Sequence, residues 1–274
     1  MRLGVDIGGT TITVGAVENG LLKAISTSPS FRSGATLEET GEYLCELIKA
    51  QLVDNVTSIG IGVPSVVDTE NGIVYNTANI PSWQEFHIKE YLEDRLGVTV
   101  AVDNDANCFA IGAHSKLNAP EQGTFVGVTL GTGVGIGIVN DGKIMRGANA
   151  GAGELSWLPH EGDTLEHWCS KEFFLSRNLN PRNLCSLADG GDQDALKIFG
   201  EFGGHLSTLL TLVLCAYDPS IVVFGGGISN CARHFEHTMT AAVKSSFPFP
   251  KSLERLQIKY MSDPDTAVIG AALL

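Results

Sequence analysis

The chain has 274 residues, of which 43% are hydrophobic, so it can form one large or two medium domains with a substantial core. It carries 31 acidic and 18 basic residues, a formal net charge of −13, which argues against sequence-independent binding of nucleic acid. The six cysteines form no CxxC or CxC pair, so they indicate reduced core thiols rather than a zinc knuckle or a redox motif.

The N-terminal residues 1–6 are predicted to form a strand rather than a signal peptide. No apolar run reaches the roughly 18 residues of a membrane-spanning helix. We therefore expect a cytoplasmic protein without a membrane or nucleic-acid partner.

Apolar runs and helical periodicities alternate along the chain, which is typical of α/β domains. Strands are expected over residues 3–28 (two or three), 57–63, 98–102, 124–139 (two), 221–224 and from 258. Helices are expected over residues 36–52, 84–96, 106–114, 165–178, 192–216 and 266–274, and one after Gly227, with an irregular glycine-rich stretch over 145–163.

Two glycine-threonine turns, Gly8-Gly9-Thr10 and Gly131-Thr132-Gly133, follow buried strands and lead into a second β-rich run. Each second run ends in a hairpin signal, Asn19-Gly20 or Asp141-Gly142. Glycines let a ligand approach backbone N–H groups, which suit phosphate. One such turn alone favours an ordinary glycine-rich hairpin. The matched pair with similar flanks instead predicts two related halves that hold a polyphosphate.

Asp105 lies just after the predicted strand 98–102, at the edge where open α/β sheets bind ligands. A carboxylate there can accept a proton from a substrate hydroxyl as a general base. Alternatively, Asp103 and Asp105 serve as caps of the helix that follows.

Five motifs occur in an order that resembles the ROK family of sugar kinases, within the actin- and hexokinase-like ATPase superfamily, and the resemblance covers essentially the whole chain. They are Asp6-Ile7-Gly8-Gly9-Thr10, Asp103-Asn104-Asp105-Ala106-Asn107, Gly131-Thr132-Gly133-Val134-Gly135, Arg146-Gly147-Ala148-Asn149 followed by Ala152-Gly153-Glu154, and Asp218 to Gly227. The resemblance implies a two-lobed, actin-like (ribonuclease H-like) α/β fold with an interlobe cleft. We place a small N-terminal lobe over 1–115, joined by helix 265–274, and a large lobe over 116–264.

The resemblance also implies the role of each site residue. Asp105 would be the catalytic base, and the sugar would contact Asn79, Asn104, Glu154 and Glu166. ATP phosphates would lie on Gly8, Gly9, Thr10, Gly131, Thr132 and Gly133, with Gly225, Gly226 and Gly227 on the nucleotide side. Asp6 would hold Mg²⁺, directly or through water.

Departures from the family pattern concern metal and substrate. Family members carry Glu-x-Gly-His and a zinc-binding CxCGxxGCxE loop, whereas this chain has Trp157 in place of the histidine and lacks the loop. His160, His167 and Cys169 do not reproduce a closed four-ligand site, so we expect no structural zinc and packing around Trp157 and Trp168 instead. The usual lysine after the first threonine is Thr11, and a glycine of the GxPG segment is Ser65.

We therefore expect an ATP- and Mg²⁺-dependent, glucokinase-like hexose kinase that acts as a homodimer. One alternative is a kinase for a modified sugar, an N-acylhexosamine or a β-glucoside, because Trp157 replaces the histidine. Another is a non-catalytic sugar sensor, which is disfavoured because the chain begins directly at the first phosphate strand and retains Asp105.

Overall fold

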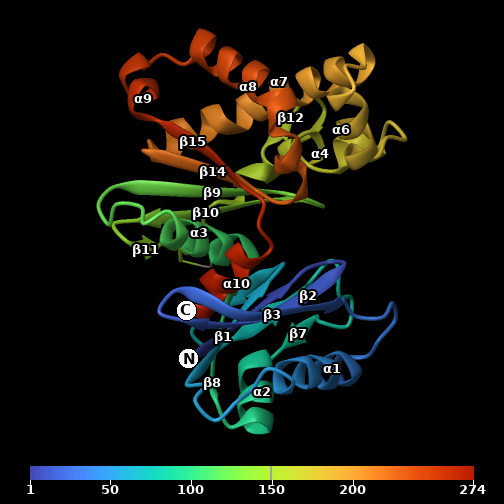
Figure 1. Ribbon diagram of the computed structural model, residues 1–274, viewed down its shortest axis with the longest axis vertical. Helices are drawn as coiled ribbons and strands as arrows, with labels where there is room; N and C mark the ends of the chain where they lie inside the picture. The colour runs from blue at the N-terminus through green and yellow to red at the C-terminus, as the bar shows by residue number, and fades with distance from the viewer. Residues whose placement is uncertain (149) are drawn as a thin grey trace.

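The computed structural model describes residues 1–148 and 150–274, and two sheets dominate it. The first has strand order β3-β2-β1-β4-β8 and the second β11-β10-β9-β14-β15 (Figure 1). The first contains Arg2–Ile7 (β1), Thr11–Glu18 (β2), Leu21–Pro29 (β3), Ser58–Val63 (β4) and Thr99–Asn104 (β8). The second contains Thr124–Leu130 (β9), Val134–Asn140 (β10), Lys143–Ile144 (β11), Ile221–Gly225 (β14) and Gln257–Met261 (β15).

The two sheets have the same topology. In each, the first strand pairs antiparallel with the hairpin strand and parallel with a later strand, which pairs parallel with the last one. The hairpins turn at Asn19-Gly20 and Asp141-Gly142, all four residues with positive φ, as a two-residue type I′ turn requires. The repeated glycine turns therefore mark a duplicated architecture, as the sequence predicted.

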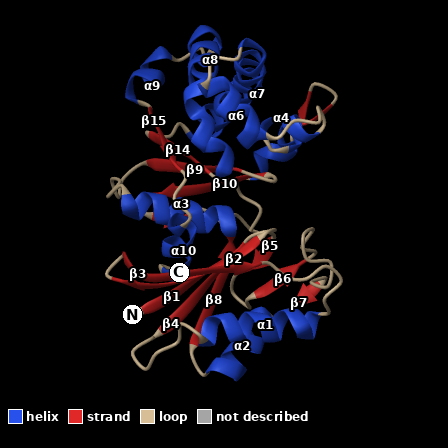
Figure 2. Ribbon diagram, turned by 45° about the vertical axis from the view of Figure 1, so that its right-hand side comes forward, coloured by secondary structure: helices blue, strands red, loops and turns tan. Residues whose placement is uncertain are grey.

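Helices cover the outer faces of the sheets (Figure 2). The first sheet carries Leu37–Lys49 (α1) and Ile88–Leu96 (α2). The second carries Leu165–Cys169 (α4), Glu172–Leu175 (α5), Pro181–Asp189 (α6), Gln193–Tyr217 (α7), Ala232–Ser246 (α8) and Pro250–Arg255 (α9). The helix expected over 165–178 is thus two short helices, and α6 and α9 were not predicted.

Two helices lie between the sheets, Asp105–Lys116 (α3) and Asp265–Ala272 (α10) (Figure 1). Glycines allow their backbones to touch: a Cβ on Gly60 of β4 would lie 1.7 Å from the Ala271 oxygen, and one on Gly270 1.7 Å from the Cys108 oxygen. The C-terminal helix consequently packs on the first sheet and on α3. The lobe boundary near residue 115 stays a prediction, because α3 also packs against β9 and β10.

A small sheet of Val66–Asp68 (β5), Ile73–Tyr75 (β6) and Glu85–Phe86 (β7) was missed by the sequence reasoning. Trp83 anchors the segment before β7: its ring is fully buried against Phe31 and Phe86, and its Nε1 donates to Thr40 Oγ1 at 2.8 Å. The same segment leaves Asn79 exposed. Short antiparallel strands on one edge carry too little periodicity to be recognised.

Helix α7 is long and apolar enough to cross a membrane by length and composition alone, contrary to our reading that no such segment exists. Its apolar face contains Phe199, Phe202, Leu206, Leu210 and Val213, all buried, and α7 packs against α8. A core helix passes the same test, so this is weak support for a membrane span.

Candidate active site

Three parallel strands of the first sheet end side by side at the predicted site. Asp6 of β1 is in register with Gly62 of β4, which is in register with Asp103 of β8. Gly62 has no side chain because α3 begins there: a Cβ would lie 3.1 Å from Cys108 Sγ and 3.5 Å from the Asp105 Cα. The lack of a side chain at Gly62 thus allows the start of α3 to pack on β4, the strand between those of Asp6 and Asp103.

Asp105 is the first residue of α3, and the helix cap is Asn104. Asn104 Oδ1 accepts from the N–H groups of Ala106 (2.9 Å) and Asn107 (3.3 Å), while its Nδ2 donates to the Ser65 oxygen at 3.2 Å. The cap of the helix is therefore Asn104 and not Asp103 or Asp105, although Asp105 Oδ1 also accepts from the Ala106 N–H at 2.8 Å. A side-chain amide makes at most four hydrogen bonds, so Asn104 retains one N–H for a ligand.

Burial, together with the nearby Asp6 carboxylate, raises the pKa of Asp105 to about 7, against hydrogen bonds from the backbone of Ala106 and Asp105. Burial likewise raises the pKa of Asp6 to about 6. Two half-buried carboxylates that share a site favour a shared proton or a divalent cation, and oxygen donors are those that Mg²⁺ prefers. Asp6 and Asp105 thus fit the expected magnesium.

The first glycine turn lies against the predicted sugar ligand. A Cβ on Gly9 would lie 3.4 Å from Asn79 Nδ2. The Gly8 N–H donates to the Thr11 oxygen at 2.8 Å, and Ser30 Oγ donates to the Gly8 oxygen at 2.9 Å, so the end of β3 braces the turn. Gly9 and Thr10 are exposed.

The second turn lies against Glu166 of α4. Its Oε2 accepts from the Val134 N–H at 3.2 Å and would lie 2.7 Å from a Cβ on Gly133. The Lys171 N–H holds the Gly131 oxygen at 2.9 Å, and Thr132 is exposed. The structure thus places one predicted sugar ligand on each predicted phosphate turn.

Glu154 begins a short 3₁₀ helix, Glu154–Trp157, whose Trp157 side chain is 64% exposed. Partial burial raises the pKa of Glu154, a hydrogen bond from Trp157 lowers it, and the Glu166 carboxylate raises it again. Glu154 also raises the pKa of Asp105. The charges of Asp6 and Glu154 therefore act on Asp105, and the charge of Glu166 acts on Glu154, although these residues come from both halves of the chain.

The glycines of the third run, Gly225 to Gly227, differ in their surroundings. A Cβ on Gly225 would lie 2.2 Å from Phe109 of α3, and Gly226 has φ +81° with its Cβ position 2.3 Å from the Leu130 oxygen. These two glycines permit close packing, whereas Gly227 is exposed with open space around it. The nucleotide contacts expected of all three glycines stay a prediction.

An ion pair that the sequence reasoning missed joins β8 to the glycine-rich stretch. Asp103, 1% exposed, accepts from Arg146 Nε at 2.8 Å and lies 2.7 Å from its NH2, and it also accepts from Asn107 Nδ2 at 2.8 Å. A buried carboxylate requires a charged or hydrogen-bonding partner. The position of Asp103 on a buried strand was therefore the signal that could have predicted an ion pair. Asn149, which belongs to the same motif, lies outside the described residues.

The region of the missing zinc loop is assembled differently from our expectation. Trp157 is exposed, so packing there centres on Trp168 alone, whose ring lies 4.5 Å from that of His205. His160 Nε2 is 3.0 Å from His205 Nδ1, while burial raises the pKa of the Cys169 thiol well above its ordinary value. The expected lack of structural zinc stays a prediction.

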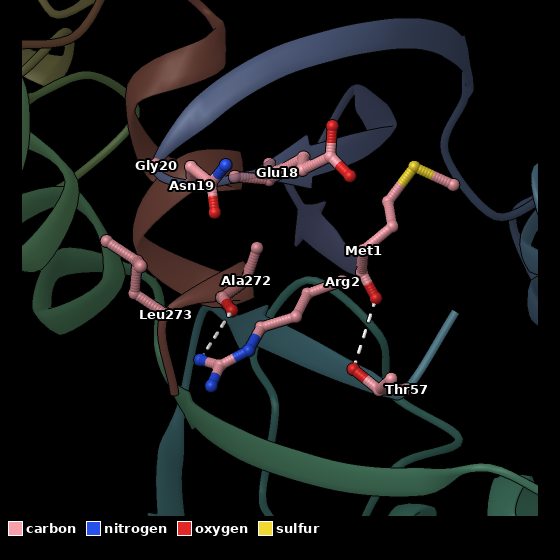
Figure 3. Close-up of a pocket in the computed structure, with 9 residues that line it drawn as sticks. Met1, Arg2, Glu18, Asn19, Gly20, Thr57, Ala272 and Leu273 are labelled. Atoms are coloured by element: carbon pink, nitrogen blue, oxygen red, sulfur yellow. Dashed lines mark hydrogen bonds between the residues drawn. The ribbon is translucent and has the colours of Figure 1, made fainter. Parts of the chain in front are cut away.

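A cavity of about 470 Å³ opens at the other end of β1, between Arg2, Asn19, Thr57 and Leu273 (Figure 3). Arg2 NH1 donates to the Ala272 oxygen at 3.4 Å, and Thr57 Oγ1 donates to the Met1 oxygen at 3.2 Å. The predicted site residues lie at the opposite, carboxyl end of the strand, so the cavity is separate from the carboxylate cluster.

Fold and comparisons agree on the class of protein. The paired sheets and their glycine turns are those of the two-lobed, actin-like ATPase fold. The ROK family glucokinase of Streptomyces griseus, solved with glucose and AMPPNP, superposes with a TM-score of 0.82 at 24% identity and covers 99% of this chain and 97% of its own. The ROK hexokinase of Thermus thermophilus gives 0.79 at 25% identity, covering 99% and 96%.

Residues 2–274 match the ROK family, and the chain belongs to it. The N-acetyl-D-glucosamine kinase of Vibrio cholerae is 30% identical to it, over 100% of this chain and 99% of the relative. The N-acetyl-D-glucosamine kinase of Aliivibrio salmonicida is 29% identical over 86% of this chain and 87% of its own.

Proposed function

We propose that this chain, an ATP-dependent sugar kinase, phosphorylates a hydroxyl of an N-acylhexosamine. The observation that carries the phosphoryl transfer is Asp105, whose pKa of about 7 and position at the start of α3 suit a general base near neutral pH. The Vibrio cholerae relative with full coverage, an N-acetyl-D-glucosamine kinase, supports the substrate class.

In the proposed mechanism, Asp105 accepts the proton of the sugar hydroxyl as that oxygen attacks the γ-phosphoryl group. The exposed turns at Gly9-Thr10 and Thr132-Gly133 direct backbone N–H groups at the phosphates. Mg²⁺, when bound near Asp6, supplies charge neutralisation. Catalysis of this kind rests on positioning and electrostatics rather than on covalent chemistry.

The sugar would contact Asn79 and the free N–H of Asn104 on one side, and Glu154 and Glu166 on the other. Trp157 supports the acylated substrate, because its exposed ring next to Glu154 offers an apolar surface for a methyl group. A family histidine would instead offer a polar group there.

A coupled ATPase assay over glucose, N-acetylglucosamine and N-acetylmannosamine tests the substrate class. We expect kcat/KM for one N-acetylated sugar to exceed that for glucose at least about tenfold, since buried apolar contacts to a methyl group contribute about 1–3 kcal/mol. Trp157→His should narrow that ratio. Glucose turning over as well as either acetylated sugar would establish the second candidate, a hexose kinase, which the glucokinase and hexokinase folds favour.

A further inference from the structure

A second cavity, of about 490 Å³, lies between helix α7 and the hairpin formed by Pro159–His160 (β12) and Asp163–Thr164 (β13). Its wall contains His160, Glu161, Trp168, Arg177, Glu201 and His205. The proposed phosphoryl transfer uses none of these side chains, so two imidazoles and a carboxylate converge there without an assigned role.

The three donor groups face one another at metal-ligand spacing. His160 Nε2 is 3.0 Å from His205 Nδ1, and the Glu161 carboxylate oxygens lie 4.0 Å from the first and 3.9 Å from the second. Bonds of 2.0–2.1 Å in a tetrahedral zinc site place ligand atoms about 3.3 Å apart. Shifts of less than about 1 Å therefore bring all three atoms onto one ion.

The local backbone holds this arrangement in place. Glu161 and Gly162 form the two-residue turn of the hairpin with φ values of +47° and +84°, and a non-glycine residue adopts the first of these at a cost. The two imidazoles are 14% and 12% exposed, whereas Glu161 is 59% exposed at the cavity mouth. The Trp168 ring covers His205 at 4.5 Å.

We propose that His160, His205 and Glu161 form a binding site for a divalent transition metal such as Zn²⁺, with the fourth position left to solvent. Imidazole ligands select Zn²⁺, Ni²⁺ or Cu²⁺ over Mg²⁺. The lining favours a cation, because the two negative charges of Glu161 and Glu201 exceed the single positive charge of Arg177. The Arg177 guanidinium donates to the Phe173 oxygen at 2.7 Å.

Of the three groups that the sequence analysis found near the missing zinc loop, only His160 belongs to this site, and His167 and Cys169 take no part in it. His167 Nδ1 lies 3.6 Å from Asp163 Oδ2, and Cys169 is fully buried. Three protein ligands with one at the surface would hold a metal that exchanges with solvent, which differs from a closed four-ligand structural zinc site.

The metal would act on the sugar-binding segment, a consequence that rests on the proposed function. The hairpin follows Glu154 and Trp157 directly and precedes Glu166. Metal binding between the hairpin and α7 would fix the segment that carries both carboxylates.

Another group of potential ligands, Cys185, Asp189 and His234, is already satisfied. Asp189 accepts from Arg233 Nε at 2.7 Å and from its NH2 at 2.6 Å, and His234 Nε2 lies 2.9 Å from Oδ1. A guanidinium among the donors repels a cation, so His234 serves as a control.

Co²⁺ titration of chelator-treated protein without nucleotide tests the proposal. We expect one equivalent to produce the visible absorption of tetrahedral cobalt, to be displaced by Zn²⁺ but not by Mg²⁺, and to raise Tm. His205→Gln should weaken binding at least about tenfold. Glu161→Gln, at an exposed turn that tolerates the change, should do so without loss of fold. His167→Gln and His234→Gln should bind as the wild type does.

Equal Co²⁺ affinity in wild type, His205→Gln and Glu161→Gln would overturn the site and leave a hydrogen-bonded histidine pair. This readout does not depend on kinase activity, so it separates the metal site from the proposed function. If metal binds but the KM for the sugar is unchanged in Glu161→Gln, the site stands and its coupling to the sugar segment is wrong.

Discussion

The aspartates at the ends of β1 and β8 and at the start of α3 differ in their electrostatic environments. Asp103 pairs with Arg146, whereas Asp6 and Asp105 have raised pKa values, because burial disfavours both charges and the Asp6 charge adds to the effect at Asp105. Perturbed groups of this kind cluster where chemistry occurs. Arg146 sets this difference, because its guanidinium pairs with Asp103 and not with Asp6 or Asp105.

Asp105→Asn should lower kcat by about 10²–10⁴-fold, because a positioned base contributes that much. The amide retains the shape of the side chain and its acceptor for the Ala106 N–H, so the circular dichroism spectrum should not change. A steady-state assay with saturating ATP and sugar measures the effect. A variant with more than half of the wild-type kcat would remove Asp105 from the mechanism.

Stability should fall as pH rises through the raised pKa values. A folded-state pKa of about 6 or 7, above the unfolded value near 4, means that the folded state binds more protons between those limits. The stabilisation is complete below about pH 4 and is lost by about pH 7. Asp6→Asn should consequently raise the free energy of unfolding at pH 8 by on the order of 2 kcal/mol and have little effect at pH 4.

Urea unfolding at the two pH values provides the measurement, and Asp54→Asn, at an exposed position outside the site, is the control. Mg²⁺ at pH 8 should stabilise the wild type more than Asp6→Asn, because the cation favours the charged carboxylates. A Mg²⁺ effect of equal size in both proteins would contradict the placement of magnesium at Asp6.

At the scale of elements, long periodic segments were predictable and short ones were not. Helices α1 and α7 and the strands beside the glycine turns fall where the sequence placed them, because each carries its own period. The split of residues 165–178 into α4 and α5, and the β5–β7 sheet, depend on packing across the chain. For the same reason the sequence indicated Asp105 but could not show that Asn104 caps α3 or that Arg146 reaches Asp103.

Arg146→Met should destabilise the protein by about 2–4 kcal/mol, because it leaves the Asp103 charge buried with only neutral hydrogen-bond partners. Arg32→Met removes a pair with Glu39 at 3.0 Å in which both side chains are at least half exposed, and it should cost less than about 1 kcal/mol. Chemical denaturation compares the two. Equal losses would mean that the Asp103–Arg146 pair is no more than a surface contact.

At the scale of the whole molecule, each of the duplicated sheets carries one glycine turn, and α3 and α10 lie between the sheets (Figure 1). Backbone contacts at Gly60 and Gly270 leave little freedom between α10 and the first sheet or α3. The homodimer and the cytoplasmic location remain predictions, and so does the lobe boundary, because α3 packs against both sheets.

Sugar binding should close the two halves on each other, because the proposed ligands Asn79 and Asn104 come from one half and Glu154 and Glu166 from the other. A ligand shifts a conformational equilibrium only by its difference in affinity for the two states, and contacts to both halves exist together only in the closed one. Solution scattering with and without a turned-over sugar should therefore show a smaller radius of gyration. Trp157, which is exposed, should report closure by fluorescence, whereas the buried Trp83 should not. An unchanged radius together with unchanged Trp157 emission would mean that the site is preformed and that substrate binds without moving the halves.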